Sequence, residues 1–261
     1  MSINITLGQI NIKSGDVAAN LECVKTIAQN LPGGSILLLP ELWSSSYDLV
    51  NTPSICMENK SALKELANTA RLAQIFIGGS ILEEINGEVY NSFNLISPNG
   101  EISAKYQKIH LFKIMDEHIW MKPGQKPVMV DLEAVKVGLA ICYDLRFPEL
   151  FRHYAIQGCK LMLLSAEWPV RRINHWKILL QARAIENQCF VAAVDCVGQT
   201  GNAVYGGNSL IIDPWGRILA EGSQTEEQQL SADIDINVAD EFRRKIPALD
   251  DRRPEVYSSW R

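Results

Sequence analysis

Short apolar runs rich in β-branched residues alternate along the chain with stretches whose apolar positions repeat at helical spacing. The segments 3–10 (INITLGQI) and 35–40 (SILLLP) have the length and composition of strands. The stretch 16–30 has helical spacing instead. One apolar face of this helix is formed by Val17, Leu21, Val24, Ile27 and Ala28. This alternation predicts a layered α/β architecture.

The pattern continues through the rest of the chain. Helices are expected at 61–74, from about Pro148, and at about 174–187. Further strands are expected at 75–81, 135–141, 161–166, 189–196, 209–214 and 217–222. Two hairpins are expected, around the turns at 98–100 (PNG) and 214–216 (PWG). No low-complexity linker or repeat of fixed period interrupts the pattern, so we expect one domain, residues 1–261, built of two sheets flanked by helices.

Charge and cysteine content exclude several classes of protein. Lys and Arg number 25 against 30 Asp and Glu, which gives a net charge of -5, and the basic residues are scattered, so nucleic acid is not expected as a partner. No apolar run approaches the ~20 residues of a membrane span. The six cysteines are widely spaced without a CxxC pair, so neither a zinc knuckle nor a disulfide scaffold is indicated. We expect a cytoplasmic protein.

Three reactive side chains lie at or just past the end of an apolar strand. Glu41 follows ILLLP, Lys108 follows AKYQ, and Cys142 follows VGLAI at a strand-to-helix turn. Open α/β sheets place their ligand sites at such strand ends. Taken singly, each residue has an ordinary structural explanation, as a solvated Glu, a surface Lys or a Cys that fills the core.

The motifs around these residues are more specific than the residue types. The segments PELW with Glu41, KIHLF with Lys108 and CYDLRFPE with Cys142 resemble, in order and spacing, the nitrilase (carbon–nitrogen hydrolase) superfamily. The resemblance extends over nearly the whole chain, including HWKILLQARAIENQ at 175–188. It implies a four-layer αββα sandwich of the α/β class with a Glu-Lys-Cys catalytic triad.

The chemistry of amide hydrolysis explains this combination of residues. We expect Cys142 to attack the carbonyl carbon as a thiolate, or as a thiol that Glu41 deprotonates during attack. Lys108 and the backbone N–H of Tyr143 are expected to stabilise the negative oxygen of the tetrahedral intermediate. Glu41 would then protonate the departing ammonia and activate the water that hydrolyses the thioester. Because these groups supply every step, no metal or organic cofactor is expected.

A second carboxylate is a candidate supporting group. Many family members have a further Glu before a Pro-Gly pair, and Glu117 precedes Gly124 by 124 − 117 = 7 residues. Asp116 is an adjacent competitor, and Glu117 is alternatively a loop carboxylate without a role. The histidines are too dispersed for a metal cluster, and His110 is expected to brace local structure. Apolar filling is expected of Cys23, Cys159, Cys189 and Cys196.

The motifs look most like the omega-amidase group, which hydrolyses the terminal amide of 2-oxoglutaramate and 2-oxosuccinamate. Such a substrate carries a carboxylate, so the pocket is expected to present a cation at its far end. The sequence does not rank the candidates, which are Arg146, Arg171, Arg172 and Arg183. Arg183 also fits an ion pair with Glu186 at i+3, and Arg146 also fits a brace for the helix after Cys142.

Two alternatives remain open from the sequence. The chain is alternatively an amidase for another small amide, such as deaminated glutathione or an N-carbamoyl compound. In a different class, it is a catalytically silent interaction module that kept the fold. The intact triad argues against the second alternative, because a binding module needs no nucleophile, base and oxyanion donor together.

The last expectation concerns assembly, for which we predict a homodimer or a higher homo-oligomer. The helix after Cys142 has more apolar residues than one buried stripe needs. These residues are Phe147, Leu150, Phe151, Tyr154 and Ile156. A second copy is expected to cover the spare face, with the C-terminal segment 246–260 packed across the seam.

Overall fold

The computed structural model describes residues 2–132 and 135–259, which form two six-stranded sheets and a short two-stranded ribbon. The first sheet has the order β14-β1-β2-β3-β4-β5 and the second has the order β13-β12-β9-β8-β7-β6. Strands of the first sheet are β1 (Ser2–Gln9), β2 (Ile36–Leu38), β3 (Phe76–Ile85), β4 (Glu88–Ile96), β5 (Ile102–Gln107) and β14 (Gln228–Asp235). Strands of the second sheet are β6 (Met129–Leu132), β7 (Val135–Ile141), β8 (Leu161–Ser165), β9 (Phe190–Val194), β12 (Leu210–Ile212) and β13 (Ile218–Glu221). The ribbon consists of β10 (Gln199–Thr200) and β11 (Ala203–Val204).

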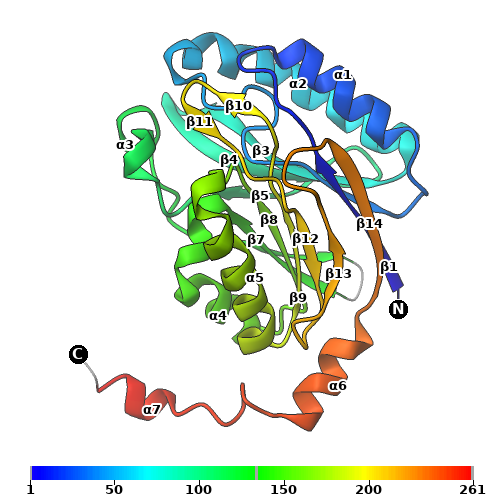
Figure 1. Ribbon diagram of the computed structural model, residues 1–261, viewed down its shortest axis with the longest axis vertical. Coiled ribbons are helices and arrows are strands. Elements are labelled where there is room, and N and C mark those ends of the chain that lie inside the picture. Colours follow the sequence, from blue (N-terminus) through cyan, green and yellow to red (C-terminus); the bar gives the residue numbers. More distant parts are fainter. Residues whose placement is uncertain (1, 133–134, 260–261) are drawn as a thin grey trace.

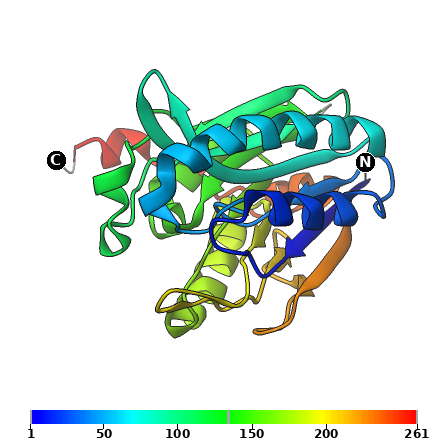
Figure 2. The ribbon, with the colours of Figure 1, turned by 90° about the horizontal axis from the view of Figure 1, so that it is seen from above.

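Helices cover the outer face of each sheet, and the result is the expected αββα order of layers (Figures 1 and 2). The helices α1 (Val17–Ala28) and α2 (Thr52–Ala73) lie on the first sheet, whereas α4 (Pro148–Ile156) and α5 (Ile173–Asn187) lie on the second. One large apolar cluster takes residues from both sheets and from α4 and α5, and a second fills the space beneath α1 and α2. The predicted α/β sandwich is therefore confirmed.

Parallel pairing at the centre of each sheet brings the carboxyl ends of its strands to one edge. In the first sheet β1 pairs with β2 and β2 with β3, all parallel. In the second, β7 pairs with β8 and β8 with β9, again parallel. The central strands β2, β8 and β9 are buried along their whole length, as strands covered on both faces should be.

The first helix shows how local sequence positions these layers. Asp16 caps α1, and its carboxylate accepts a hydrogen bond from the Ala19 N–H at 3.0 Å. All the apolar residues predicted for the inner face of this helix are buried, which confirms that prediction. The second helix begins at Thr52, which is 61 − 52 = 9 residues earlier than expected, with Pro53 in its first turn.

Both predicted hairpins are present, and a third was missed. The third joins β3 to β4 through Asn86 and Gly87, whose φ angles are 53° and 82°. Positive φ at both positions is what a type I′ turn requires, and Asn-Gly is its preferred dipeptide. The strands β6 and β14 were also not predicted. The edge strand β14 pairs antiparallel with β1 and has the polar sequence QQLSADID, which lacks a strong apolar alternation.

The apolar residues of α4 correct the prediction about assembly. Phe151 and Tyr154 are 0% and 1% exposed, because they pack into the core of this one chain. Of the residues predicted to form a spare face, Ile156 at 42% is the most exposed. The prediction that this helix leaves a spare apolar face is therefore wrong.

The C-terminal part begins on the sandwich, where Ala239 and Phe242 are buried, and then continues past it. It contains α6 (Asn237–Lys245) and α7 (Pro254–Tyr257), and Figure 1 shows α7 reaching away from the layers. Trp260, the last residue of the segment predicted to cross a dimer seam, lies outside the described residues. Within the described part of the chain, no helix has the length and apolar character needed to cross a bilayer.

Candidate active site

The three predicted residues converge although they come from both sheets. Lys108 directly follows β5, Cys142 directly follows β7, and Glu41 lies three residues after the end of β2. The side chains of Glu41 and Lys108 are 0% exposed. Cys142 is 6% exposed. The site therefore forms at the strand ends where the sequence placed it, and it is almost completely shielded from solvent.

Cys142 occupies a sharp turn between β7 and the 3-10 helix η3 (Cys142–Arg146). Its φ angle is 42°, a left-handed conformation that is uncommon for a residue other than glycine and that marks functional turns. The Asp144 carboxylate holds this turn by accepting hydrogen bonds from the Ile141 N–H at 2.9 Å and the Tyr106 hydroxyl at 2.7 Å. At this turn the thiol lies within the influence of the charges of Glu41, Lys108 and Glu117.

His110 supports the same turn. Its backbone N–H and its ring Nδ1 lie 3.1 and 2.7 Å from Asp144 Oδ1, and its ring stacks on Phe147 with centroids 3.7 Å apart. These contacts confirm that His110 braces local structure.

Lys108 joins two carboxylates at the centre of the site. Its Nζ lies 2.7 Å from Glu41 Oε1 and 2.6 Å from Glu117 Oε1. Burial disfavours the ammonium, but the charges of Glu117 and Glu41 outweigh burial and raise the pKa of Lys108 well above its usual range. Asn91 Nδ2 donates a further hydrogen bond of 2.8 Å to Glu41 Oε1. Lys108 is therefore a permanent cation held between two acids.

The structure separates Glu117 from its neighbour Asp116. Glu117 begins the short helix α3 (Glu117–Trp120) and is fully buried, whereas Asp116 is exposed. The Tyr47 hydroxyl donates to Glu117 Oε1 at 2.6 Å, and the Phe112 N–H donates to Oε2 at 2.7 Å. Of the two candidate acids, Glu117 is the one that contacts Lys108.

The electrostatic setting determines the resting protonation of the nucleophile. Burial, followed by the charge of Glu41, raises the pKa of the Cys142 thiol well above 9.0, although Lys108 acts in the opposite direction. Burial also raises the pKa of Glu41 above 4.5, with Lys108 opposing it. Of the two forms that the sequence left open, the structure favours a thiol that loses its proton to a strengthened base during attack.

The backbone at the turn offers a donor beside the nucleophile. Tyr143 is in the first turn of η3, where N–H groups have no carbonyl of the same helix to bind. Together with Lys108 Nζ, this N–H gives the site a charged donor and a neutral donor for a developing oxyanion.

A narrow pocket of about 20 Å³ opens onto Cys142. Its lining residues are Tyr47, Phe112, Cys142, Tyr143, Arg146, Glu167, Trp168, Pro169 and Arg172. The Arg146 guanidinium stacks 4.9 Å above the Trp168 ring, and that of Arg172 lies 5.6 Å above Phe112. Neither arginine forms an ion pair with a carboxylate in residues 2–132 and 135–259.

The structure thereby ranks the four arginines. Arg183 is 4% exposed and donates to Leu145 O at 2.7 Å and to Glu186 Oε1 at 2.8 Å. The predicted ion pair is confirmed, and Arg183 is the brace for the turn after Cys142. Arg146 lines the pocket, and its alternative role as a brace stays a prediction. Arg171 is exposed and is not part of the pocket lining.

Sequence reasoning missed one acid in the site. Glu167 is 1% exposed, and its backbone N–H donates to Glu41 Oε2 at 3.1 Å. A signal was present, because Glu167 follows β8 just as Glu41 follows β2, and β8 is the parallel neighbour of the strand that ends at Cys142.

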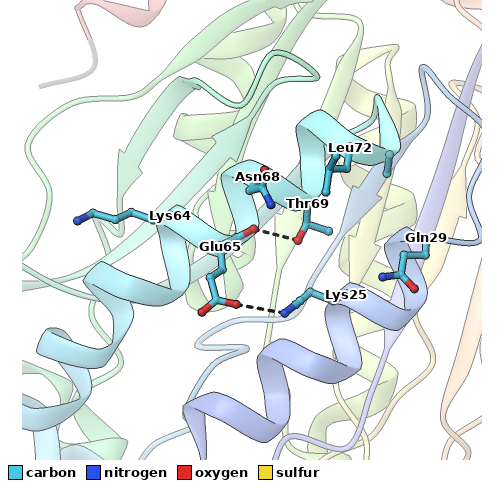
Figure 3. A pocket seen from close by; sticks show the side chains of 8 residues that line it. Lys25, Gln29, Lys64, Glu65, Asn68, Thr69 and Leu72 are labelled. Carbon is cyan, nitrogen blue, oxygen red and sulfur yellow. Dashed lines mark hydrogen bonds and ion pairs between the residues drawn. The ribbon is translucent and has the colours of Figure 1, made fainter.

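A wider groove on the outer face has a different character (Figure 3). It runs between α1 and α2, where Lys25 Nζ forms an exposed ion pair of 3.1 Å with Glu65 Oε2. Its lining contains no cysteine, so it lacks a candidate nucleophile. In the part of the chain that the structure describes, no group of three or more His, Cys, Asp or Glu side chains is arranged to hold a metal ion.

Comparison with known proteins gives consistent matches over the whole chain. The carbon–nitrogen hydrolase family model matches residues 4–244. The chain is 41% identical over 260 residues to the 2-oxoglutaramate amidase of Bacillus subtilis (strain 168), covering 98% of this chain and 100% of that relative. It is 34% identical to the omega-amidase NIT2 of Mus musculus, covering 97% and 95% of the two chains.

A solved structure agrees with the arrangement of the layers. XC1258 from Xanthomonas campestris, a CN-hydrolase superfamily protein with an arsenic adduct in the active site, superposes with a TM-score of 0.89 at 30% identity. The match covers 97% of this chain and 98% of that chain.

Proposed function

Because the chain belongs to the carbon–nitrogen hydrolase family and is an amidase, we propose that it is an omega-amidase that converts 2-oxoglutaramate or 2-oxosuccinamate to the dicarboxylate and ammonia. The single observation that carries this proposal is the pocket, which joins the Cys142 thiol to two guanidinium groups that have no carboxylate partner among the described residues.

The two arginines suit a substrate with a carboxylate at the end opposite its amide. A guanidinium binds a carboxylate through two parallel N–H groups, and stacking on an aromatic ring fixes its plane beforehand. Arg146 has a second neighbour, His175, whose Nδ1 lies 3.4 Å from its Nη2. An amide without a carboxylate would leave both cations unpaired in the pocket.

We assign the acylation step to the three converging side chains. Cys142 Sγ attacks the amide carbon while its proton passes to Glu41, and the carbonyl π electrons move onto oxygen. Lys108 Nζ and the Tyr143 N–H bind that oxyanion, and one such donor is worth roughly 2.7–4 kcal/mol of barrier. Glu41 returns the proton to the amide nitrogen, the carbon–nitrogen bond breaks, and ammonia leaves a thioester on Cys142.

Deacylation uses the same groups, with water in place of the thiol as the proton donor to Glu41. Glu41 removes a proton from a water molecule, and the resulting hydroxide attacks the thioester carbon. The second tetrahedral intermediate collapses with cleavage of the carbon–sulfur bond, and the thiolate of Cys142 recovers its proton from Glu41. One carboxyl group therefore acts as base, acid, base and acid again.

Glu117 is proposed as the catalytic support for Lys108. Its contact of 2.6 Å stabilises the ammonium when Glu41 becomes protonated, so the oxyanion donor keeps its charge through the cycle. A second carboxylate also disfavours the ionised form of Glu41 and so strengthens it as a base.

The test is ammonia release from 2-oxoglutaramate by the purified protein, with the Cys142→Ala variant as the blank. A panel containing a neutral amide of the same length, a deaminated glutathione and an N-carbamoyl compound measures selectivity. Arg146→Gln and Arg172→Gln should each raise KM about 10–100-fold for the anionic substrate only, as loss of a charged hydrogen bond predicts. Arg171→Gln is the matched control outside the pocket. Equal turnover of charged and neutral amides would reject the assignment.

We also propose that two copies associate. Large apolar side chains remain exposed at the second sheet's outer helix and in the C-terminal segment, where Ile178 is 63%, Ile185 47% and Tyr257 42% exposed. The extended course of α7 (Figure 1) suits a segment that packs on a second chain. Light scattering at micromolar concentration tests this: the mass should be twice 29.2 kDa and should fall for Ile178→Glu, whereas a mass of 29.2 kDa would reject it.

The remaining proposals concern organisation and location. A core cluster shared by the two sheets supports residues 1–261 as one domain, although residues 1, 133–134 and 260–261 lie outside the described part. All six cysteines are free, which supports a reducing, cytoplasmic setting.

A further inference from the structure

The peptide segment that follows β8 is held at every backbone polar group. Across residues 166–168, the three N–H groups donate to Val194 O at 2.8 Å, Glu41 Oε2 at 3.1 Å and Asp195 Oδ1 at 2.6 Å. The three carbonyls accept from the Glu41 N–H at 3.3 Å, the Cys142 thiol at 3.9 Å and the Gly206 N–H at 3.0 Å. No backbone group of this segment is free to adjust independently.

The middle residue of the segment touches both reacting groups. The N–H of Glu167 contacts the base, Glu41, and its carbonyl faces the Sγ of the nucleophile, Cys142. One peptide unit on either side of a single Cα thus orients a carboxylate and a thiol that must exchange a proton. A small rotation of this residue would move both contacts at once.

The side chain of Glu167 anchors the segment from behind. Its Oε2 accepts a hydrogen bond of 2.9 Å from the Ser46 hydroxyl, which also lies 2.9 Å from Thr200 Oγ1. Its Oε1 is buried, as is the Tyr205 hydroxyl, and the two groups lie near each other without a hydrogen bond of good geometry between them. The anchor connects β8 to the loop after Glu41 and to the β10–β11 ribbon.

Burial favours the neutral form of Glu167. The titratable groups that face it are Glu41, Lys108, Asp195, Tyr47, Tyr205 and Cys196. Burial raises the pKa of Glu167 well above 4.5. The Tyr205 and Ser46 hydroxyls and Lys108 oppose this rise, and Glu41 adds to it. Lys108 is already shared by two other carboxylates, so it offers little compensation for a further negative charge.

We propose that Glu167 is a positioning residue, whose buried carboxyl holds segment 166–168 so that its own N–H and C=O align Glu41 and Cys142 for proton transfer. This inference rests on the proposed function of those two residues. Glu167 itself does not touch the reacting carbon or exchange a proton with it; it acts through its backbone.

The variants Glu167→Gln and Glu167→Ala separate this role from a merely structural one. Gln keeps the shape and a hydrogen-bonding group without a charge, so it should recover most of the kcat that Ala loses. We expect kcat in Glu167→Ala to fall about 10–100-fold with KM changed less than threefold, as misalignment at a reacting centre predicts. Glu83→Ala, which removes a mostly buried acid that pairs with Lys105 on the first sheet, is the matched control.

A second readout does not depend on the substrate. The rate of Cys142 alkylation by iodoacetamide, followed from pH 5 to 9, reports proton transfer from thiol to base. Glu167→Ala should slow it at neutral pH, Glu167→Gln should restore it, and the profile of the Gln variant should not be displaced along the pH axis. If the wild-type protein releases no ammonia but alkylation follows this pattern, the substrate assignment fails and the positioning role stands.

Three results would overturn the proposal. They are an Ala variant within twofold of wild type in both readouts, a Gln variant as impaired as Ala, and a Gln profile displaced by half a pH unit or more, which would show a charged Glu167. If Glu167→Ala does not fold, Ser46→Ala loosens the same anchor from its other end. It should lower kcat and alkylation in the same direction, and unchanged rates would reject the role.

Discussion

Two groups of buried carboxylates flank Cys142, and they differ in their partners. Asp144 accepts hydrogen bonds from a backbone N–H, a tyrosine hydroxyl and two nitrogens of His110, all between 2.7 and 3.1 Å. Glu41 and Glu117 also accept from neutral donors, but in addition they share a single ammonium, that of Lys108. Both groups are fully buried, so burial does not distinguish them.

The difference in partners explains the difference in use. A carboxylate surrounded by fixed donors has one stable arrangement, and it therefore shapes the turn at Cys142. Two carboxylates around one ammonium can accept a proton at either acid while the cation stays in place. The first arrangement determines geometry, and the second permits proton transfer. Variants on each side should therefore fail in different ways.

The largest effect is expected from the residue between the two groups. Cys142→Ala should lower kcat on the order of 10⁴-fold or more, because it removes the only atom that forms the covalent intermediate. The melting temperature should change little, since the side chain is small and lies at a turn. Ammonia release and thermal unfolding measure the two quantities. Near wild-type activity in this variant would remove Cys142 from the mechanism.

Glu41→Gln tests the proton-transfer side. Gln keeps the shape and a hydrogen bond with the Glu167 N–H but cannot accept the thiol proton, so acylation should slow by about 10²–10⁴-fold. The defect should be visible in the first turnover, which rapid-quench measurement of thioester formation detects. A normal first turnover followed by slow steady state would confine Glu41 to deacylation.

Lys108→Arg should be less severe but still damaging. The charge is kept, yet a planar fork replaces a compact ammonium in a fully buried space between Glu41 and Glu117. We expect kcat to fall about 10²–10³-fold, the usual effect of losing one oxyanion donor. Turnover equal to that of wild type would show that the site needs only a positive charge there.

Asp144→Asn should affect stability more than activity, which is the opposite of the effect expected for Cys142→Ala. It replaces an acceptor of several hydrogen bonds by an amide that also donates, so one buried donor faces another, at a cost of about 1–3 kcal/mol in the free energy of unfolding. Activity should fall only as far as the turn at Cys142 loosens. Urea unfolding and kcat, measured on the same sample, test this: a large loss of kcat without loss of stability would place Asp144 among the reacting groups.

The sequence predicted the site residues and the layers that local patterns encode. Glu41, Lys108 and Cys142 follow apolar strands, and Glu117 keeps a fixed distance from Gly124, so motif and spacing suffice to find them. The layers follow from alternating strands and helices. The turn at Asn86 and Gly87 was also encoded locally and was overlooked.

Contacts between distant segments were not predictable in this way. Arg146 was one of four candidates that the sequence did not rank, because its contacts with Trp168 and with His175, which is 29 residues away, are not encoded locally. Glu167 takes its anchor from Ser46, 121 residues earlier in the chain. The burial of Phe151 follows from packing between layers, and its apolar character alone gave the wrong face for association.

A modest effect is expected on the dependence of stability on pH, which tells whether Glu167 resembles Asp144 or Glu41. Because burial raises the pKa of Glu167 above its ordinary 4.5, the folded protein binds a proton there that the unfolded chain releases. This contribution to stability is fully present below about pH 4.5, and it is lost as the pH rises through the folded-state pKa.

Glu167→Gln cannot ionise, so it should keep the stability that the wild type loses on going from pH 5 to pH 8. The raised pKa of Glu41 is common to both proteins and cancels in their difference. The charge of Glu167 is one cause of the raised pKa of Asp195, so its loss in the variant changes the difference in the same direction. The melting temperature of the variant minus that of the wild type should therefore increase with pH, by a few °C, since ~1 kcal/mol shifts the midpoint of a chain of this size by about 2–4 °C. A difference that stays constant would mean that Glu167 titrates alike in both states, and one that decreases would mean that it is ionised and stabilised in the fold.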